Sequence, residues 1–184
     1  MIRRISAVAL LLAGFLAVFA VPMASADNGG IPIGVTYGAF YPVSASTVDH
    51  FGNGWTRFSI GHVNPRAPKD WRPGLDFTSL QADGPDSASI YAVNYGVTKG
   101  IGPASQSVQP YVSLGAGPFL ADVDSLSLGV DTTRVGLNVA ATAGLIFSQR
   151  FFVEARFDYF TEVSGIDFNG ITLQAGIRVF DLRL

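Results

Sequence analysis

Alternation of apolar and polar residues, with a repeat of two, is the main pattern in the chain after about residue 30. The segment Phe151–Phe160 is the clearest case. Its odd-numbered residues are all aliphatic or aromatic, whereas Glu154, Arg156 and Asp158 occupy even-numbered positions. A repeat of two is typical of a β-strand, whose successive side chains point to opposite faces. The pattern therefore predicts an all-β chain whose strands each have one apolar and one polar face.

Eight segments share this pattern and are separated by turn-forming residues. They are Ile31–Tyr41, Trp55–Val63, Leu75–Gln81, Ser89–Thr98, Pro110–Leu120, Arg134–Phe147, Phe151–Glu162 and Ile171–Phe180. Several approach the roughly 9–11 residues that a tilted strand needs to cross a bilayer. The third is short, so either its ends extend further or the barrel is thin there. Ser44–Phe51 breaks the alternation and predicts a single helical turn, with Ser44 or Ser46 as N-cap and Gly52 after its end.

The first 26 residues have the layout of a secretory signal peptide. Arg3 and Arg4 precede an unbroken apolar run, Ala7–Val21, and Ala24–Ala26 forms a small-residue cleavage site. The run is shorter than the roughly 20 residues of a transmembrane helix, although an uncleaved anchor is the alternative. We expect residues 1–26 to be a signal peptide and residues 27–184 to be one β-barrel domain.

The composition narrows the class of exported protein. Charged residues make up 14% of the chain, against about 25% in ordinary soluble proteins. There is no cysteine, so no disulfide stabilises the domain and no lipoprotein anchor follows the leader. The formal charge of −2 provides no basic stripe, which argues against a nucleic-acid partner. A β-barrel in lipid and a soluble exported barrel or sandwich both remain open.

Three features favour the lipid-facing alternative, in which the apolar face points outward. The polar face is rich in glycine, as a narrow lumen with long side chains requires; these residues are Gly34, Gly38, Gly115, Gly117, Gly136, Gly144 and Gly176. It also has balanced charges, which we predict to form a lumen charge network of Arg57, Asp76, Glu154, Arg156, Asp158 and Arg178. Tyr and Trp lie near strand ends, where an interfacial girdle is expected, at Tyr37, Tyr41, Trp55, Trp71, Tyr91, Tyr111 and Tyr159.

The signal peptide, the eight segments and the closing hairpin of Phe151–Tyr159 with Leu173–Phe180 together resemble the small outer-membrane barrel families typified by OmpA and OmpX. The resemblance implies an eight-stranded antiparallel up-and-down transmembrane β-barrel in the outer membrane of a Gram-negative-type bacterium. It also implies periplasmic termini, with outer-membrane lipid and the barrel-insertion machinery as partners, and we expect a monomer. Four outer loops follow from it: Pro42–Gly54, Ala82–Ala88, Ala121–Thr133 and Val163–Gly170.

The end of the last strand departs from that family pattern. Members usually end in an aromatic residue, whereas this chain ends in Leu184. Leu182 and Leu184 are out of phase with Ile177 and Val179, so either the strand stops near Phe180 or a β-bulge shifts it.

Residues that could perform catalysis are few. The only histidines are His50 and His62, and no close-spaced set of carboxylates accompanies them as metal ligands. Asp49 and His50 are a candidate catalytic pair, but neighbouring residues point apart and no serine is specifically placed. We therefore predict no catalytic, cofactor or metal site.

The sequence favours a structural or surface-interaction barrel with a lumen filled by side chains and without catalysis. A narrow pore or a carrier of a small apolar ligand is the alternative, and the charge network would then act as a gate. The remaining hypotheses are a soluble exported barrel of the lipocalin type and a lipid-modifying enzyme. Eight strands enclose side chains or one small ligand, which makes a wide channel incompatible with the strand count.

Overall fold

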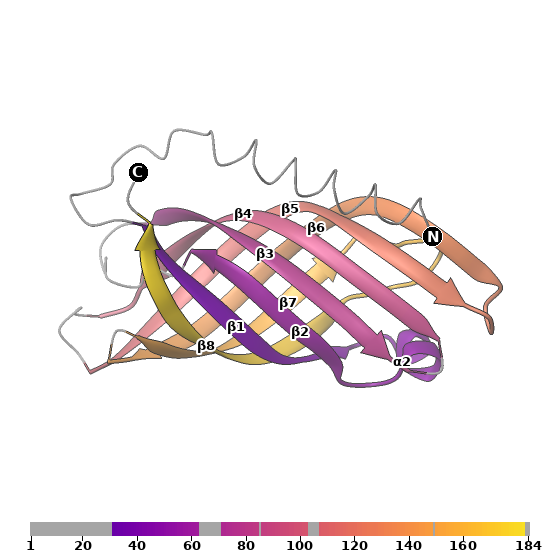
Figure 1. Cartoon of the computed structure of the whole chain (residues 1–184), viewed down its shortest axis with the longest axis horizontal. Coiled ribbons are helices and arrows are strands. Elements are labelled where there is room, and N and C mark those ends of the chain that lie inside the picture. Colours follow the sequence, from indigo (N-terminus) through magenta and orange to yellow (C-terminus); the bar gives the residue numbers. More distant parts are fainter. Residues whose placement is uncertain (1–30, 63–70, 85, 103–106, 149, 183–184) are drawn as a thin grey trace.

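The eight alternating segments form eight strands, each hydrogen-bonded antiparallel to the next, and the last strand returns to the first to close a barrel (Figure 1). The computed structural model describes residues 31–62, 71–84, 86–102, 107–148 and 150–182, so the predicted signal peptide lies outside the described residues. The elements are β1 (Ile31–Pro42), α2 (Ala45–Phe51), β2 (Trp55–His62), β3 (Arg72–Asp83), β4 (Ser87–Gly100), β5 (Val108–Ser125), β6 (Val130–Phe147), β7 (Phe151–Phe160) and β8 (Gly170–Leu182). The predicted fold class is confirmed.

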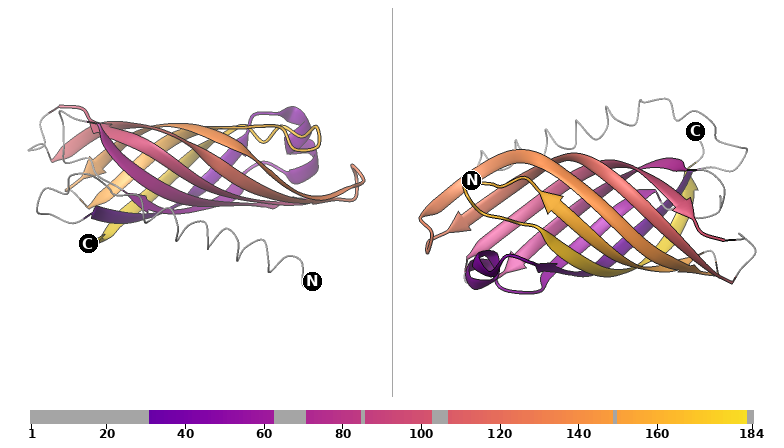
Figure 2. Two further views of the ribbon diagram at one scale, coloured as in Figure 1. Left: turned by 90° about the horizontal axis from the view of Figure 1, so that it is seen from above. Right: turned by 180° about the vertical axis from the view of Figure 1, so that it is seen from behind.

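The helix α2 and the β5–β6 turn lie at the opposite end of the barrel from the finish of β8. Both views of Figure 2 show α2 and the tip of the β5–β6 hairpin at one end, and the finish of β8 at the other. We call these the loop end and the terminal end. The helix matches the predicted helical turn, since it begins after Ser44 and stops at Gly52, whose φ of 79° suits glycine. No helix in the described part of the chain has the length and apolarity that crossing a membrane requires.

The predicted loop Ala121–Thr133 is wrong, because β5 and β6 continue through most of it as 18-residue strands. Only a four-residue turn, residues 126–129, joins them. The polar residues there indicated a loop, but Asp122 and Thr133 pair across the strands, and the Thr133 hydroxyl donates to the Asp122 carboxylate at 2.9 Å. These side chains are polar because the hairpin has left the apolar belt. The third strand is likewise longer than predicted, at 12 residues.

A β-bulge explains the phase change near the end of β8. Gly34 pairs with Arg178 and Ile33 pairs with Phe180, so Val179 is the extra residue on β8. The strand then continues to Leu182, opposite Ile31. Of the two explanations that the sequence allowed, the bulge is correct.

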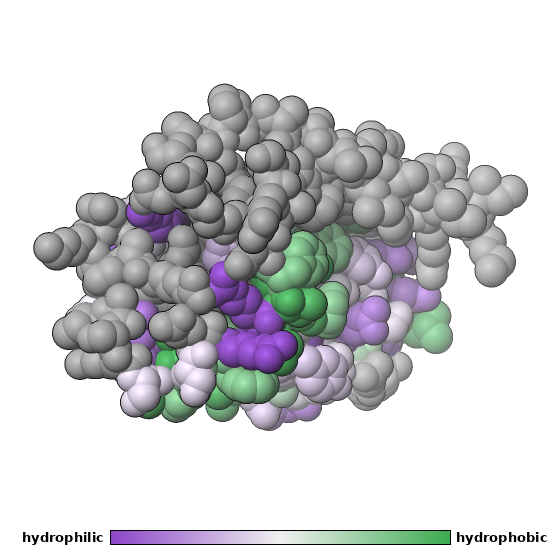
Figure 3. Space-filling view, turned by 60° about the vertical axis from the view of Figure 1, so that its left-hand side comes forward, coloured by the Kyte–Doolittle hydropathy of each residue, from purple (hydrophilic) through white to green (hydrophobic). Residues whose placement is uncertain are grey.

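The apolar face points outward, as predicted. Leu173, on the outer wall of β8, keeps 56% of its surface exposed, whereas Arg57 and Asp158 inside the barrel are almost fully buried. Val153 and Phe157 share the outer wall with Leu173. An accessible outer wall made of such residues is favourable only where the medium around the barrel is lipid. Figure 3, which brings the side near the terminal end forward, shows hydrophobic side chains next to hydrophilic ones on the visible wall.

Two of the predicted girdle aromatics lie inside the barrel instead. Trp55 and Tyr111 are buried, because both fall on the lumen phase of their strands. Each has a polar partner there: the Trp55 indole N–H donates to the Gly52 carbonyl at 3.0 Å, and the Tyr111 hydroxyl donates to Glu154. The exposed members of the predicted girdle are Tyr37, Tyr41, Trp71 and Tyr159.

The lumen glycines make room for aromatic rings on neighbouring strands. A Cβ atom added at Gly144 would lie 2.5 Å from the Tyr111 ring, and one at Gly136 would lie 2.5 Å from the Phe119 ring. Gly176 has the same relation to Phe152. The predicted pairing of small with long side chains in a narrow lumen is therefore confirmed at these positions.

Candidate functional site in the barrel lumen

Arg57 lies at the centre of the lumen and is fully buried. Alternation on β2 points its side chain inward between the neighbouring strands. Its guanidinium donates to the Asp158 carboxylate at 2.5 Å and to the Thr172 hydroxyl at 2.9 Å. It also donates to Thr78 at 3.1 Å and to Ser59 at 3.3 Å. This buried cation is therefore both paired with an anion and hydrogen-bonded, which burial of a charge requires.

Arg156 extends the network toward the terminal end. Its Nε donates to the second oxygen of Asp158 at 3.0 Å, and its Nη1 donates to Asp76 at 2.8 Å. Asp158 thus lies between two guanidiniums, and Thr78 bonds to Asp76 at 3.1 Å. Four of the six predicted network residues form one connected cluster, in which two positive charges balance two negative ones. We call Arg57, Asp76, Arg156 and Asp158 the lumen network.

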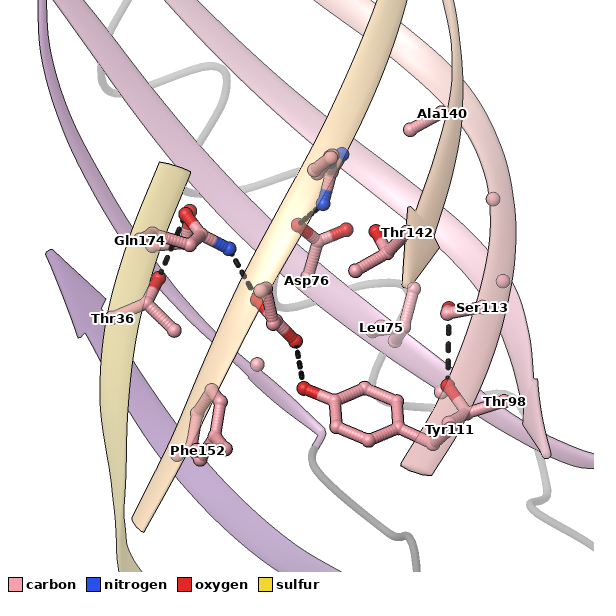
Figure 4. A pocket seen from close by; sticks show the side chains of 18 residues that line it. Thr36, Leu75, Asp76, Thr98, Tyr111, Ser113, Ala140, Thr142, Phe152 and Gln174 are labelled. Atoms are coloured by element: carbon pink, nitrogen blue, oxygen red, sulfur yellow. Dashed lines mark hydrogen bonds and ion pairs between the residues drawn. The ribbon is translucent and has the colours of Figure 1, made fainter. Parts of the chain in front are cut away.

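Glu154 is inside the lumen as predicted, with different partners. It accepts hydrogen bonds from the Tyr111 hydroxyl and from the Gln174 amide (Figure 4). Gln174 in turn accepts from Thr36 at 3.4 Å. Arg178, the sixth predicted residue, is half-buried on the lumen phase of β8 nearer the terminal end. The uncharged partners were missed, although Gln174 and Thr36 lie on the polar phase of their strands and could have been found from it.

A small polar cavity lies in the lumen on the terminal side of the network (Figure 4). Its volume is about 80 Å³, well below the roughly 300–1,000 Å³ of ordinary ligand pockets. Its polar lining residues are Thr36, Ser59, Asp76, Thr98, Tyr111, Ser113, Thr142, Glu154, Arg156 and Gln174. Leu75, Ala140, Phe152 and five glycines complete the lining. The small volume and the hydroxyl and carboxylate groups suit water or a small polar solute better than an apolar ligand.

The lumen is apolar at the loop end, which the sequence analysis did not predict. Aromatic rings from α2, from four of the strands and from the β7–β8 connection pack there, with Phe119 and Phe160 centroids 5.0 Å apart and Phe40 and Trp55 centroids 5.6 Å apart. We call the following residues the aromatic plug: Phe40, Phe51, Trp55, Phe119, Phe160 and Phe168. Leu80, Ile90 and Val123 fill the space around the rings. The available signal was the presence of aromatic residues on the otherwise polar phase of their strands, at Phe40, Trp55, Phe119 and Phe160.

Loops at the loop end are held together by one carboxylate. Asp86 accepts from the Ser125 hydroxyl at 2.7 Å, from the backbone N–H of Leu126 at 3.1 Å and from the Ser127 hydroxyl. His50 of α2 lies 2.9 Å from the Ser127 hydroxyl through Nδ1. We call Asp86, Ser125, Ser127 and His50 the Asp86 clamp. It fastens α2 and the β3–β4 connection to the tip of the β5–β6 hairpin.

The Asp86 clamp contains Ser, His and Asp, but its geometry is not that of a catalytic triad. In a triad the histidine lies between the other two residues and uses both ring nitrogens. Here Ser127 donates directly to Asp86, and Nδ1 of His50 makes the contact with Ser127 while lying 3.8 Å from Asp86. Asp49, which the sequence offered as a candidate partner of His50 and which we did not predict to be catalytic, is exposed and does not belong to the clamp. The clamp therefore fits a structural role.

The Asp86 clamp should persist across neutral and mildly acidic pH. Hydrogen bonds from the Ser127 and Ser125 hydroxyls hold the pKa of Asp86 below its usual value. A carboxyl with a depressed folded pKa contributes stability above its unfolded pKa, about 3.9, and loses it as pH falls through the folded value. We expect the Leu126 amide, followed by hydrogen-exchange mass spectrometry, to stay protected relative to its intrinsic exchange rate down to about pH 4. In an Asp86→Ala protein this amide should exchange near its intrinsic rate at every pH, whereas an Asp49→Ala protein should match the parent. Protection of Leu126 in Asp86→Ala equal to that of the parent would contradict the clamp.

Among the described residues, no group of three or more His, Cys, Asp and Glu side chains is placed to hold a metal ion. The lumen carboxylates instead bond to guanidinium, hydroxyl and amide groups. The arrangement therefore gives a packed, charge-balanced interior in which the described side chains form no recognisable metal centre.

A closed eight-stranded barrel with an apolar outer wall and a polar, charge-balanced interior defines a small transmembrane β-barrel. The family described as "Outer membrane protein beta-barrel domain" matches residues 8–178. The chain therefore belongs to that family, and it is an outer-membrane protein of a Gram-negative-type bacterium. No curated protein matches the chain.

Solved structures with the same fold include small outer-membrane barrels of low sequence identity. Neisserial surface protein A is 16% identical, with a TM-score of 0.57, over 81% of this chain and 94% of its own. The outer membrane enzyme PagL is 11% identical, with a TM-score of 0.51, over 80% and 98% of the two chains. The N-terminal barrel domain of Pseudomonas aeruginosa OprF is 13% identical, with a TM-score of 0.51, over 82% and 97%. These similarities establish the fold.

Proposed function

We propose that this protein is a closed, non-conducting and non-catalytic outer-membrane barrel whose loop end provides a structural or surface-interaction role. The observation that carries the proposal is that the lumen is blocked twice in succession. The aromatic plug fills the loop end, and the Arg57–Asp158 pair crosses the middle. An ion would have to displace both to pass.

Several observations favour this function over the alternatives. The small polar cavity argues against a carrier of apolar ligands, as its walls would leave hydroxyls and carboxylates facing the ligand. The direct Ser127–Asp86 bond argues against hydrolysis by the histidine-containing cluster. The similarity to the enzyme PagL is a similarity of fold, and catalysis depends on the site rather than on the fold. A role on the cell surface also agrees with the name of the structurally similar Neisserial surface protein A.

Conductance in planar bilayers tests the proposal. We expect no sustained current steps from the parent protein. A Phe51→Ala, Phe168→Ala double variant should also remain closed, because the lumen network still blocks the middle of the barrel. Phe157→Ala, which removes an exposed lipid-facing ring, is the matched control. Sustained steps from the parent protein would contradict the closed-lumen proposal and support the narrow-pore alternative.

A further inference from the structure

The β5–β6 hairpin rises above the rest of the barrel wall. In Figures 1 and 2 its tip extends beyond α2 at the loop end. Strand β6 pairs with β5 along its whole length, Val130–Phe147. It pairs with β7 only from Asn138 to Phe147, because β7 ends at Phe160. The upper part of β6 therefore has a strand neighbour on one edge and none on the other.

The last contact on the β7 side shows which backbone groups face the open edge. The Leu137 carbonyl accepts from the Thr161 N–H at 3.0 Å, and the Leu137 N–H donates to the Thr161 hydroxyl at 3.0 Å. Alternate residues of an antiparallel strand direct their backbone groups to the same side. Asp131, Thr133 and Val135 therefore present their N–H and C=O groups to the open edge. Within the described residues, no backbone group outside the strands bonds to them there.

This open edge is exposed and held in place. The side chains of Asp131 and Thr133 are exposed, and Val135 keeps 73% of its surface accessible. The Asp86 clamp fastens the turn that joins β5 to β6, through the bonds of Asp86 to Ser125 and Leu126. A strand that is already ordered loses little further conformational entropy when a second strand binds.

We propose that the open edge of β6 over Asp131–Val135 binds an extended polypeptide segment of a partner protein by β-strand addition, and that this segment carries basic side chains. Main-chain hydrogen bonds give such complexes their affinity, and alternate side chains give them specificity. The inference rests on the surface role proposed above, for which the loop end must face the cell exterior.

Charge indicates the basic character of the partner. Asp124 pairs directly with Asp131 on the outer face of the hairpin, and Asp122 is two residues from Asp124 on the same face. Glu162 is exposed and directly follows Thr161, the residue that bonds to Leu137 where the open edge begins. Arg134 is the one nearby basic residue in the described part of the hairpin, and it falls on the opposite phase of β6. Lysine or arginine on the outer face of an added strand would relieve this excess of negative charge.

A second copy of this chain is a poorer occupant. Two barrels inserted in one membrane with the same orientation are related by rotation about the membrane normal. Because barrel strands tilt by about 35–45° from that axis, the two β6 edges would cross instead of lying antiparallel. The edge is therefore better suited to a separate, extended segment.

Peptide binding to the folded protein in detergent micelles tests the proposal. The probe is a fluorescent peptide, acetyl-Lys-Val-Lys-Val-Lys-Val-Lys-amide, and binding is followed by anisotropy. Thr133→Pro removes the N–H at the centre of the open edge without breaking a bond to β5, and an edge position tolerates proline. We expect it to weaken binding by about tenfold or more, as the loss of central main-chain bonds implies. Thr133→Ala is the matched control, since both variants lose the hydroxyl bond to Asp122.

Further arms of the experiment identify the occupant. Val135→Pro should weaken binding in the same way, and each variant must keep the gel shift of a folded barrel before boiling. Glutamate in place of lysine in the peptide should abolish binding. Equal affinity of the parent and Thr133→Pro proteins, or equal affinity for the two peptides, would overturn the inference. So would a dimer in light scattering that Thr133→Pro dissociates. Conductance of the same preparations is measured separately. A failure of peptide binding would therefore contradict the strand-addition proposal without bearing on the closed-lumen proposal.

Discussion

Replacing Arg57 by methionine should destabilise the folded barrel by about 3–5 kcal/mol, the range measured when one partner of a buried ion pair is removed. The substitution keeps a long side chain of similar reach but removes the cation that bonds to Asp158 at 2.5 Å. Asp158 would then keep Arg156 as its one paired cation, with a long 3.4 Å hydrogen bond from the Asn138 amide, in an almost completely buried position. Thr78 and Thr172 would also lose the guanidinium donors to which they now bond.

Reversible urea unfolding of the protein refolded into lipid vesicles, followed by tryptophan fluorescence, measures this effect. Arg150→Met is the matched control, because Arg150 is exposed and surface substitutions usually change stability by within about 0.5 kcal/mol. The double variant Arg57→Met, Asp158→Leu should be less destabilised than Arg57→Met, since it no longer buries an unpaired charge. A loss below about 1 kcal/mol in Arg57→Met would mean that the pair is not buried as described.

The contribution of this pair also bears on the proposed function. An ion pair that lies across a narrow lumen blocks the passage of ions while the two side chains stay together. The free energy needed to separate them therefore sets how often the lumen is open. Arg57 bonds to residues from three other strands, β3, β7 and β8. Because one side chain joins so many strands, opening the middle of the lumen would cost several hydrogen bonds at once. The same network thus stabilises the barrel and keeps it closed.

The strand count, the phase of each strand and the lumen position of the charged residues could all be predicted from the sequence. These follow from alternation, which is local: Glu154, Arg156 and Asp158 share a face whatever the rest of the chain does. Their partners depend on register, which is set between strands. Arg156 therefore bonds to Asp76, 80 positions away, and Glu154 bonds to Tyr111 rather than to an arginine. Alternation places a residue inside the barrel without fixing its height along the axis.

The loop end was predicted least well. The aromatic plug joins Phe51 of α2 and Phe168 of the β7–β8 connection to lumen residues such as Trp55. The Asp86 clamp likewise gathers residues from α2, the β3–β4 connection and the β5–β6 turn. No periodic pattern relates such positions, so single-sequence reasoning has no signal for their contacts. The composition of residues 121–133 was misleading as well, because polar residues on a strand outside the membrane resemble those of a loop.

The second large effect tests the orientation on which the whole fold depends. Leu173→Arg, on the outer wall between β1 and β7, should destabilise the protein in a bilayer by up to about 2–4 kcal/mol, the cost measured for arginine on the lipid face near the midplane. Leu173 pairs with Ala155 and Ala39 and is exposed to the surroundings of the barrel, so the cost comes from lipid and not from crowding.

Gln81→Arg is the matched control for Leu173→Arg. Gln81 is exposed on the outer face of β3 near the loop end, where the cost of arginine falls to about 0–1 kcal/mol. Urea unfolding in vesicles measures both variants against the parent. If the outer wall faced water, arginine at position 173 would be solvated as easily as at position 81, and the two variants would unfold alike. A clear difference between them therefore requires a depth-dependent apolar environment around the barrel, and it also places the loop end, with the open edge of β6, outside the hydrocarbon.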